Sequence, residues 1–487
     1  MNRRSALRDG ADTLRVRARP QVVAVTLAKH APVFTILYAP PAIWAGVTGA
    51  FELTIALAVP AIAALFAYMV VRARSLPADL RGLEAMVAVA LVFFLGALGA
   101  VPAFMTVGMP FFDAVFEAMS GLTTTGLSVA SDPDSWPFAV HILRAWLQWV
   151  GGLVMATAVL ALILPSGVPT RRLGQVGITD GDRIASTRLK ARQLLGVYLG
   201  LTAVAVAITA LVIPDWREAL ALTLSAISTG GFAPRSDSLA SYSDLGQTVV
   251  MATCVIGALS LVTFVFVLRG DWGAVRTLGS LRRLAVAVAA VLAAMVVLWA
   301  LGGLENRDLS LGLALDLISA LTTAGFSTGA MPITGAIFAL FILVMVLGGD
   351  TGSTAGGLKL ARLGLLARAA RHAIRAPAMP DSAVAPLRHD GEQVEDAVII
   401  GVLALAFIYA ISALLLVMQF SLHGFSLPQS LFESISALST VGLSTGLIGA
   451  DLPTDLKISL TFAMWLGRLE FIAVLVLFLP RTWMKGS

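Results

Sequence analysis

Four short stretches of the chain repeat the same hydroxyl and glycine residues at the same spacing, without gaps. They read SGLTTTGLS at 120–128, SAISTGGFA at 225–233, SALTTAGFS at 319–327 and SALSTVGLS at 436–444. Each stretch has a serine, a threonine four residues later and a glycine two residues after that. One such turn carries little information, but four in the same register indicate four copies of one structural unit.

These residue types are suited to binding a monovalent cation that has lost its water. Rings of backbone carbonyls can replace the hydration shell of a potassium ion, and threonine hydroxyls can add further oxygen ligands. Glycine allows backbone with φ > 0, which lets successive carbonyls point to one axis. Four unrelated glycine turns are the alternative, and the shared register argues against it. The pattern therefore predicts a cation site where the four turns meet.

A short amphipathic stretch precedes each copy, and in three of them it carries an acid nine residues ahead of the glycine. These acids are Glu117, Asp316 and Glu433, whereas the second copy has Leu222 at this position. Asp113 and Glu218 lie one helical turn earlier in the first two copies. Because carboxylates are favoured near the start of a helix, we predict short helices that end at the turns. We expect the acids themselves to cap these helices and to solubilise the outer surface.

The elements that must position the turns are membrane spans. Of the 487 residues 58% are hydrophobic and only 13% are charged, whereas about a quarter of a soluble domain is charged. This composition excludes a soluble enzyme and a disordered scaffold. A spanning helix needs about 20 apolar residues. We predict spans at 33–49, 51–71, 83–105, 138–164, 193–213, 246–268, 284–302, 334–347 with a continuation, 397–419 and 457–480.

Each copy of the motif lies between two spans, which gives the order span, short helix, turn, span four times. Irregular backbone at membrane depth is tolerated only where it is buried in protein or lines a wet cavity. We therefore predict an all-α polytopic membrane protein with four span–pore helix–span repeats around one central pore, preceded by an extra pair of spans. The predicted parts are a basic leader at 1–30, the extra helix pair at 31–75 and repeats at 78–170, 188–270, 281–376 and 393–487.

The basic residues lie in alternate loops, as expected for cytoplasmic loops of inserted helices. They cluster in the leader and near residues 72–81, 171–192, 269–283, 359–388 and 481–485. Both termini are therefore predicted to be cytoplasmic, and the net charge of +5 records topology rather than a nucleic-acid partner. A cytosolic protein that docks on the 171–192 and 359–388 loops is the alternative reading. The five histidines have no metal-ligand spacing, so no metal cluster or cofactor is predicted.

A glycine-rich segment interrupts the third repeat. The apolar run at 334–347 would be about 21 Å long as a helix, which is short of the ~30 Å hydrocarbon core. It leads into GGDTGSTAGGLK at 348–359. A phosphate-binding loop would need Lys directly after the closing glycine, but Leu358 stands there and Lys359 comes one position late. We predict a hinge or plug inside the membrane, with packing of small residues against neighbouring helices as the alternative.

One arginine, Arg468, falls inside the last predicted span. A mid-membrane arginine costs about 2.5–3.5 kcal/mol on insertion scales and usually faces a wet path or a partner. Glu470 is only two positions away and so lies on another face of the helix, which makes it a poor partner.

The four turns, the Gly-rich break and the GRLE sequence at 467–470 together resemble the superfamily of potassium transporters that includes TrkH, KtrB and the plant HKT proteins. The resemblance covers residues from about 83 to 484, and the extra spans resemble the TrkH branch. It implies potassium uptake through a selectivity filter formed by Thr124, Thr125, Gly126, Thr229, Gly230, Gly231, Thr323, Ala324, Gly325, Thr440, Val441 and Gly442. It implies a gate formed by Gly348, Gly349, Asp350, Gly352, Gly356, Gly357, Lys359 and Arg468, the arginine opposing cation passage.

In relatives that prefer sodium, serine replaces the first filter glycine. The presence of Gly126 therefore favours potassium here. Potassium at the filter is the only metal ion that we expect the chain to bind. The resemblance also implies a homodimer in the lipid of the cell inner membrane and a cytosolic ring of nucleotide-binding regulatory subunits. The alternatives are a secondary transporter of another small solute and a sodium-permeable cation transporter. An enzyme is not expected, because no HExxH motif, no GxSxG motif and no clustered carboxylate pair with a histidine appears in the predicted spans.

The turns depart from the TVGYG filter of potassium channels at one position. Its second glycine is replaced by Ser128, Ala233, Ser327 and Ser444. We therefore expect fewer regular ion sites and weaker discrimination between cations than in a tetrameric potassium channel.

Overall fold

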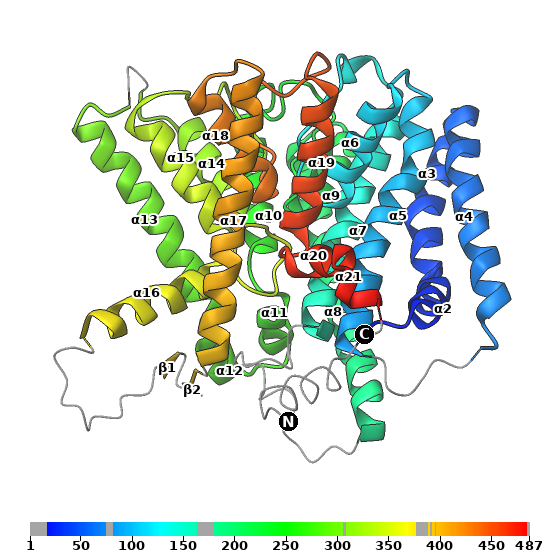
Figure 1. Ribbon diagram of the computed structural model, residues 1–487. Helices are drawn as coiled ribbons and strands as arrows, with labels where there is room; N and C mark the ends of the chain where they lie inside the picture. Colours follow the sequence, from blue (N-terminus) through cyan, green and yellow to red (C-terminus); the bar gives the residue numbers. More distant parts are fainter. Residues whose placement is uncertain are drawn as a thin grey trace, which may run out of the picture.

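The computed structural model describes residues 17–74, 81–162, 180–304, 308–375, 388–389, 392–394 and 396–484. Their regular secondary structure is nearly all helix (Figure 1), which confirms the predicted all-α fold. Among them, seven helical stretches are long and apolar enough to cross a membrane. The helices concerned are α2 (Pro20–His30) with α3 (Pro32–Val47), α4 (Phe51–Val71), α5 (Gly82–Met105), α7 (Phe138–Leu162), α8 (Asp180–Val212), α13 (Ser280–Ala300) and α17 (Asp396–Leu422). Among the regular elements of the described residues, the strand pair β1 (Arg388–His389) and β2 (Glu392–Gln393), with two residues in each strand, is not helical.

Four short helices end at the four predicted turns. They are α6 (Phe111–Leu122), α9 (Trp216–Ile227), α14 (Leu311–Thr322) and α18 (Leu427–Leu438), each 12 residues long. At 1.5 Å per residue each is about 18 Å long, too short to cross a bilayer. All four lie in the upper half of the molecule in Figure 1, between the spans that flank them. The predicted order of span, short helix, turn and span is therefore present four times.

Two of the predicted spans are broken, so the expectation of continuous helices at 246–268 and 457–480 is wrong. The first consists of α10 (Asp244–Gly257) and α11 (Leu261–Leu268), which meet at 87°, and the second of α19 (Thr454–Arg468) and α20 (Ile472–Phe478), which meet at 120°. Between α19 and α20 the backbone of Glu470 and Phe471 is left-handed, with φ of 55° and 64°. An α-helix cannot contain that conformation, so α19 ends at Arg468.

The third repeat also breaks, at the place that the sequence predicts. Helix α15 (Gly335–Leu347) ends at Gly348, and the chain stays irregular until α16 (Leu360–Arg375) begins. The other short elements are η1 (Pro133–Ser135), α12 (Trp272–Leu278) and α21 (Pro480–Trp483). In Figure 1, α16 and α20 run across the direction of the spans rather than along it.

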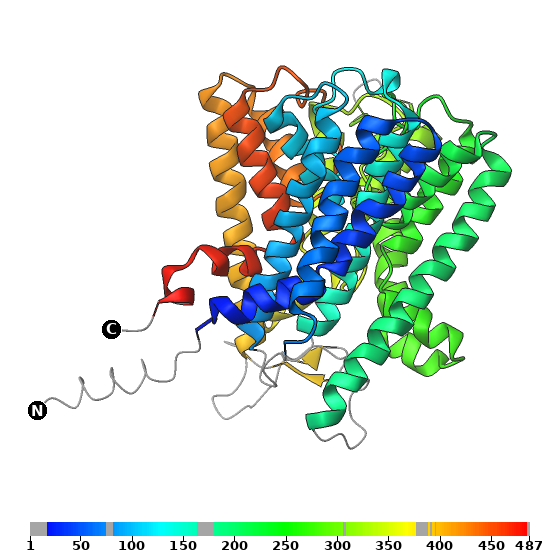
Figure 2. The same cartoon turned by 90° about the vertical axis from the view of Figure 1, so that its right-hand side faces the viewer.

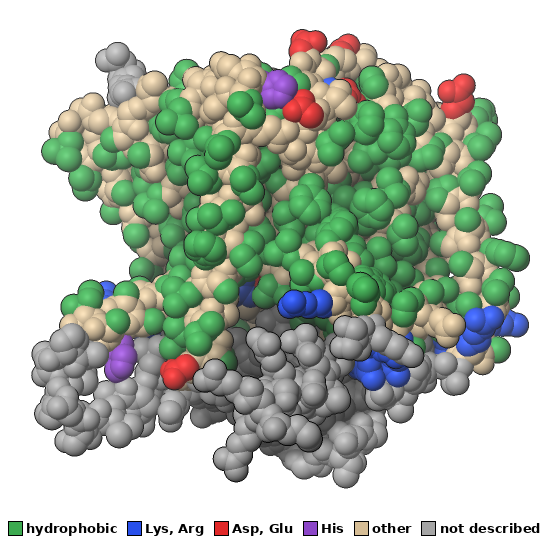
Figure 3. All heavy atoms as spheres, in the orientation of Figure 1, with side chains coloured by type: hydrophobic (Ala, Val, Ile, Leu, Met, Phe, Trp, Pro, Cys, Tyr) green, Lys and Arg blue, Asp and Glu red, His purple; other side chains and the backbone are tan. Residues whose placement is uncertain are grey.

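The surface of the helical body is that of a membrane protein. Figure 3 shows hydrophobic side chains over the middle of the molecule, with most of the visible acidic side chains at the upper end and Lys and Arg mainly at the lower end. Large apolar side chains on the outer helices are exposed, for example Phe66 on α4 and Leu415 on α17. A soluble protein does not expose such a continuous apolar surface. The chain is therefore a multi-pass membrane protein.

The beginning and the end of the described chain lie together at the lower end of the molecule (Figure 2). The Ala18 N–H donates to the Thr482 carbonyl at 2.9 Å. Beside it, the Arg19 guanidinium pairs with the buried Glu84 carboxylate of α5 at 2.7 Å. Residues 1–16, with the first four arginines of the predicted leader, lie outside the described residues.

Candidate ion path

Each of the four turns contains two left-handed residues. The glycines Gly126, Gly231, Gly325 and Gly442 have φ of 88°, 84°, 75° and 94°. Two residues earlier, the threonines Thr124, Thr229, Thr323 and Thr440 have φ of 54°, 52°, 53° and 49°. Left-handed backbone at the glycines is what the sequence predicts. At the threonines it is unexpected, because a β-branched residue strongly disfavours φ > 0.

The four turns touch one another in a closed ring that follows the order of the chain. A Cβ atom built on the glycine of any turn would overlap the carbonyl oxygen of the residue before the glycine in the next turn. The glycine–carbonyl pairs are Gly126 with Gly230, Gly231 with Ala324, Gly325 with Val441, and Gly442 with Thr125. Hence only glycine fits at these positions, and the structure brings the four turns together.

The repeated serine holds each turn to its short helix. Its carbonyl accepts the N–H of the residue before the glycine in every copy, as in Ser120 with Thr125 at 2.9 Å and Ser436 with Val441 at 2.8 Å. In these two copies the serine hydroxyl also donates to the carbonyl just after the glycine, that of Leu127 or Leu443. The serine is therefore an anchor for the turn rather than an ion ligand.

The acids of the short helices are buried behind the turns, which corrects the expectation that they cap helices at the outer surface. Glu117, Asp316 and Glu433 have exposed fractions of 0%, 5% and 0%. Glu433, for example, accepts hydrogen bonds from the Ser444 hydroxyl at 2.9 Å and the Thr445 N–H at 2.7 Å. Buried backbone donors need such partners, so each carboxylate braces the segment that follows its turn.

The Gly-rich loop at 348–359 lies directly against the inner ends of the turns. The Gly357 N–H donates to the Ser439 carbonyl at 3.0 Å, and the Gly356 N–H donates to the Thr323 hydroxyl at 2.6 Å. The Thr354 hydroxyl donates to the Gly257 carbonyl at 2.9 Å. The loop thus bonds to the second, third and fourth repeats just below the ring.

Charged groups hold both ends of this loop. Asp350 pairs with Arg283 of α13 at 2.9 Å. At the other end, the buried Lys359 ammonium donates to the Ala355 carbonyl of the same loop. Just beyond the loop, the Arg362 guanidinium pairs with the Glu470 carboxylate at 2.5 Å. Glu470 is therefore the partner of Arg362 and not of Arg468, which agrees with the prediction that it is a poor partner for Arg468.

Arg468 reaches the loop from the end of α19. Its Nη1 donates to the Thr354 carbonyl at 2.7 Å, and its Nη2 donates to the Gly151 carbonyl of α7 at 3.4 Å. The side chain is only 2% exposed. Arg468 therefore lies at a helix end beside a bend, and not in the middle of a straight span as the sequence indicated. Its partners are backbone carbonyls that sequence reasoning did not identify.

A buried ion pair joins the first and fourth repeats above the ring. The Lys457 ammonium of α19 contacts the Asp113 carboxylate of α6 at 2.7 Å and donates to the Ala450 carbonyl at 2.7 Å. The expectation that Asp113 is a surface cap at the start of its helix missed this partner. The sequence contains no signal for the pair, because its members are 344 residues apart.

We predict that Lys457→Met destabilises the protein by about 3–5 kcal/mol, because it leaves the Asp113 charge buried without a partner. Thermal unfolding of the detergent-solubilised protein should show a lower Tm. The double variant Asp113→Asn/Lys457→Met removes both charges and should recover most of the loss. A single variant as stable as the parent would contradict a structural role for the pair.

Fold and site together define the class: a helical membrane transport protein with four repeats, whose turns form a ring with an irregular loop hydrogen-bonded beneath it. The sequence profile of the TrkH family, described as a cation transport protein, matches residues 88–300 and 307–484. The chain belongs to the TrkH family of cation transport proteins.

Individual relatives agree with this assignment. The chain is 27% identical to an uncharacterized cation transporter of Methanocaldococcus jannaschii over 85% of this chain and 86% of the relative. It is 28% identical to the Trk system potassium uptake protein TrkH of Escherichia coli K12 over 80% and 83% of the two chains. The crystal structure of the potassium transporter TrkH from Vibrio parahaemolyticus superposes with a TM-score of 0.81, at 23% identity, over 95% of this chain and 99% of that one. The last comparison establishes the shared fold.

Proposed function

We propose that the protein takes up potassium ions across the cytoplasmic membrane, through the ring formed by the four turns. The observation that carries the proposal is the closed set of glycine–carbonyl contacts, in which one carbonyl from each repeat makes the equivalent contact with the neighbouring turn. Several relatives are named potassium uptake proteins, which supports potassium as the ion. No cofactor in the chain is part of the proposal.

The ring would act as a selectivity filter. Its ligands would come from the twelve turn residues named above, 124–126, 229–231, 323–325 and 440–442. Helices α6, α9, α14 and α18 end at the turns, so their C-terminal ends place partial negative charge beside the ring. This field favours a cation and needs no charged ligand.

The loop at 348–359 would act as the gate, with Arg468 holding it closed. Hydrogen bonds from the loop to Ser439, Thr323 and Gly257 keep it below the ring. An arginine there adds positive charge to the cation path. We propose that opening requires these bonds to break, which small residues with irregular backbone permit.

Assembly and orientation are also proposals. Lys and Arg gather at the end of the molecule that carries the chain ends, which supports cytoplasmic termini in the cell inner membrane. A homodimer and a cytosolic ring of nucleotide-binding subunits rest on family resemblance. The 171–179 and 376–387 parts of the proposed docking loops lie outside the described residues.

The test is rubidium uptake into proteoliposomes with varied sodium and pH gradients. We expect uptake above that of protein-free vesicles and competition by potassium. Dependence on a sodium or proton gradient would show coupling, whereas uptake driven by the rubidium gradient alone would show channel-like conduction. A complete lack of uptake, also after the gate is weakened by substitution, would contradict the proposal.

The permeability ratio of rubidium to sodium should be at least about tenfold below that of a tetrameric potassium channel in the same assay, equivalent to about 1.4 kcal/mol. In the four turns the glycine is the last residue with positive φ. The residues at the position of the second channel glycine do not have positive φ; they are Ser128, Ala233, Ser327 and Ser444. The outer carbonyls are therefore not aligned as they are in a regular filter. A ratio equal to that of the channel would show that one glycine per turn is sufficient.

A further inference from the structure

The second turn lacks the brace that supports the other three. In the first, third and fourth repeats a buried carboxylate accepts the N–H three residues after the glycine, that of Val129, Thr328 or Thr445. In the second repeat this position is Pro234, which has no N–H, and the acid is replaced by Leu222. The second turn must therefore be held in another way.

Gln148 of α7 holds it instead. Its Nε2 donates to the Gly230 carbonyl at 2.6 Å, and its Oε1 accepts the Phe232 N–H at 3.1 Å. The two bonds bridge the peptides on both sides of Gly231. The side chain is 0% exposed, and only this orientation of the amide satisfies both backbone groups.

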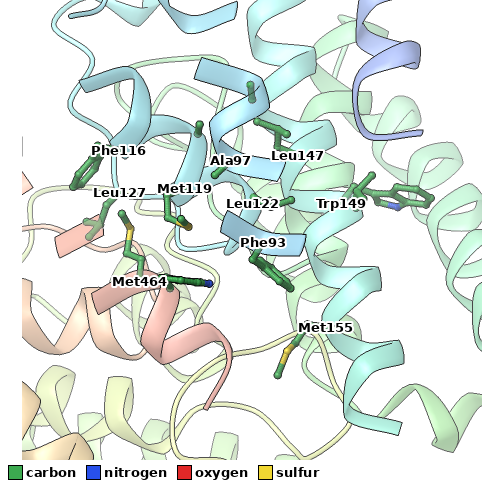
Figure 4. Close-up of a cluster of buried hydrophobic side chains, with 14 of the residues drawn as sticks. Phe93, Ala97, Phe116, Met119, Leu122, Leu127, Leu147, Trp149, Met155 and Met464 are labelled. Carbon is green, nitrogen blue, oxygen red and sulfur yellow. The ribbon is translucent and has the colours of Figure 1, made fainter. Parts of the chain in front are cut away.

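The positions equivalent to Gln148 in the second and fourth repeats carry side chains that cannot make such a bridge. Gly151, Gly257 and Gly467 are equivalent, because a Cβ on each would overlap the carbonyl of the last residue of the preceding short helix. Three residues before these glycines stand Gln148, Cys254 and Met464. Figure 4 shows Met464 beside Leu127 of the first turn, and both belong to one apolar cluster. Packing thus replaces the polar bridge there.

Gln148 consequently makes one ring carbonyl unlike the others. The carbonyl that faces Gly126 is that of Gly230. The Gln148 amide N–H occupies one of the two lone pairs of this carbonyl oxygen. No side-chain donor contacts the corresponding carbonyls of Thr125, Ala324 and Val441 in the part of the chain that the structure describes. The bridge also restricts rotation of the two peptides on either side of Gly231, a residue type with wide backbone freedom.

We propose that Gln148 is a positioning residue for cation selection, which holds the Gly230 carbonyl at the spacing that favours potassium over sodium. This inference rests on the proposed function of the ring. Without the bridge, the Gly230 peptide can move towards the axis and contact a smaller ion. The buried Phe232 N–H also loses its acceptor, which loosens the turn further.

The experiment measures rubidium and sodium uptake by Gln148→Met in proteoliposomes. Methionine keeps the length and shape of the side chain and is the residue present at the equivalent position 464. We expect the rubidium-to-sodium ratio to fall about fivefold, the equivalent of one hydrogen bond of about 1 kcal/mol. Gln148→Asn keeps the amide but is too short for both bonds, so its ratio should lie between those of the parent and Gln148→Met.

Gln247→Met is the matched control. Gln247 is also a buried glutamine, on α10, and its Nε2 donates to the Leu239 and Tyr242 carbonyls at 3.0 Å each, away from the ring. This variant should lose stability without a change in the ratio. The comparison separates the loss of a buried hydrogen bond from the loss of cation selection.

An unchanged ratio in Gln148→Met, or equal losses of both fluxes, would overturn the inference, since each indicates a purely structural role. If Gln148→Met is not obtained as a monodisperse protein, the same measurement is made on Gln148→Asn. A rubidium-to-sodium ratio equal to that of the parent protein in Gln148→Asn would then overturn the inference. If the parent protein does not prefer rubidium, or Gly442→Ser has no effect, the proposed function of the ring fails first.

Discussion

Rubidium uptake by Gly442→Ser should be at least about tenfold lower than that of the parent protein. The substitution introduces backbone strain of about 1–3 kcal/mol at a residue of the ring. Gly442 has φ of 94°, a conformation that side chains disfavour. In addition, a Cβ at this position would overlap the Thr125 carbonyl of the adjoining turn. The substitution must therefore displace one ring carbonyl or the turn that carries it.

Gly446 offers a control only four residues further along the chain. It has a similar φ of 90°, but a Cβ built on it would meet nothing within 4 Å. Gly446→Ser thus imposes comparable backbone strain without contact with the ring, and uptake should stay close to that of the parent. Uptake that is indifferent to Gly442→Ser would remove the fourth turn from the proposed ion path.

The parts of this structure that the sequence predicts are those that repeat along it. The four motifs and the spans around them are local patterns, so the short helices, the turns and the Gly-rich break could all be located. The bends after Gly257 and Arg468 could not. At the second bend, Glu470 and Phe471 adopt left-handed backbone that no local propensity favours, and tertiary packing overrides the helical pattern.

The contacts within the candidate site were harder to predict than its residues. Gln148 and Gly230 are 82 residues apart, and neither the spacing nor the residue type of Gln148 links it to the second turn. One signal was present, however. Leu222 interrupts the series of acids and Pro234 removes the N–H that an acid would bind, which together indicate a different brace in the second repeat.

One chain with four unequal repeats can tune each ligand of the ring separately. A symmetric tetramer would repeat any substitution four times around the axis. Here the position nine residues before the glycine holds Glu117 in one repeat, Asp316 in another and the apolar Leu222 in a third, while the glycine–carbonyl contact is kept in all. The geometry of the ring is therefore held constant by different side chains in different repeats.

Arg468→Ala should raise the cation uptake of the isolated protein by about tenfold, because it removes a charged hydrogen bond worth about 1.5–3 kcal/mol from the closed loop. Nη1 of Arg468 bonds to the Thr354 carbonyl, and Thr354 in turn bonds to the end of α10 through Gly257. Loss of the arginine frees the centre of the loop and also removes a positive charge that repels cations.

Arg468→Lys distinguishes these two contributions. Lysine keeps the charge but cannot span the Thr354 and Gly151 carbonyls with a planar fork. If the charge is the main barrier, uptake by Arg468→Lys should resemble that of the parent, whereas a rise as large as in Arg468→Ala would show that the bond to the loop matters more. Unchanged uptake in Arg468→Ala would contradict the gate. Because Arg468→Ala is expected to raise uptake by the isolated protein, it also provides the background in which Gly442→Ser can be measured on the isolated chain.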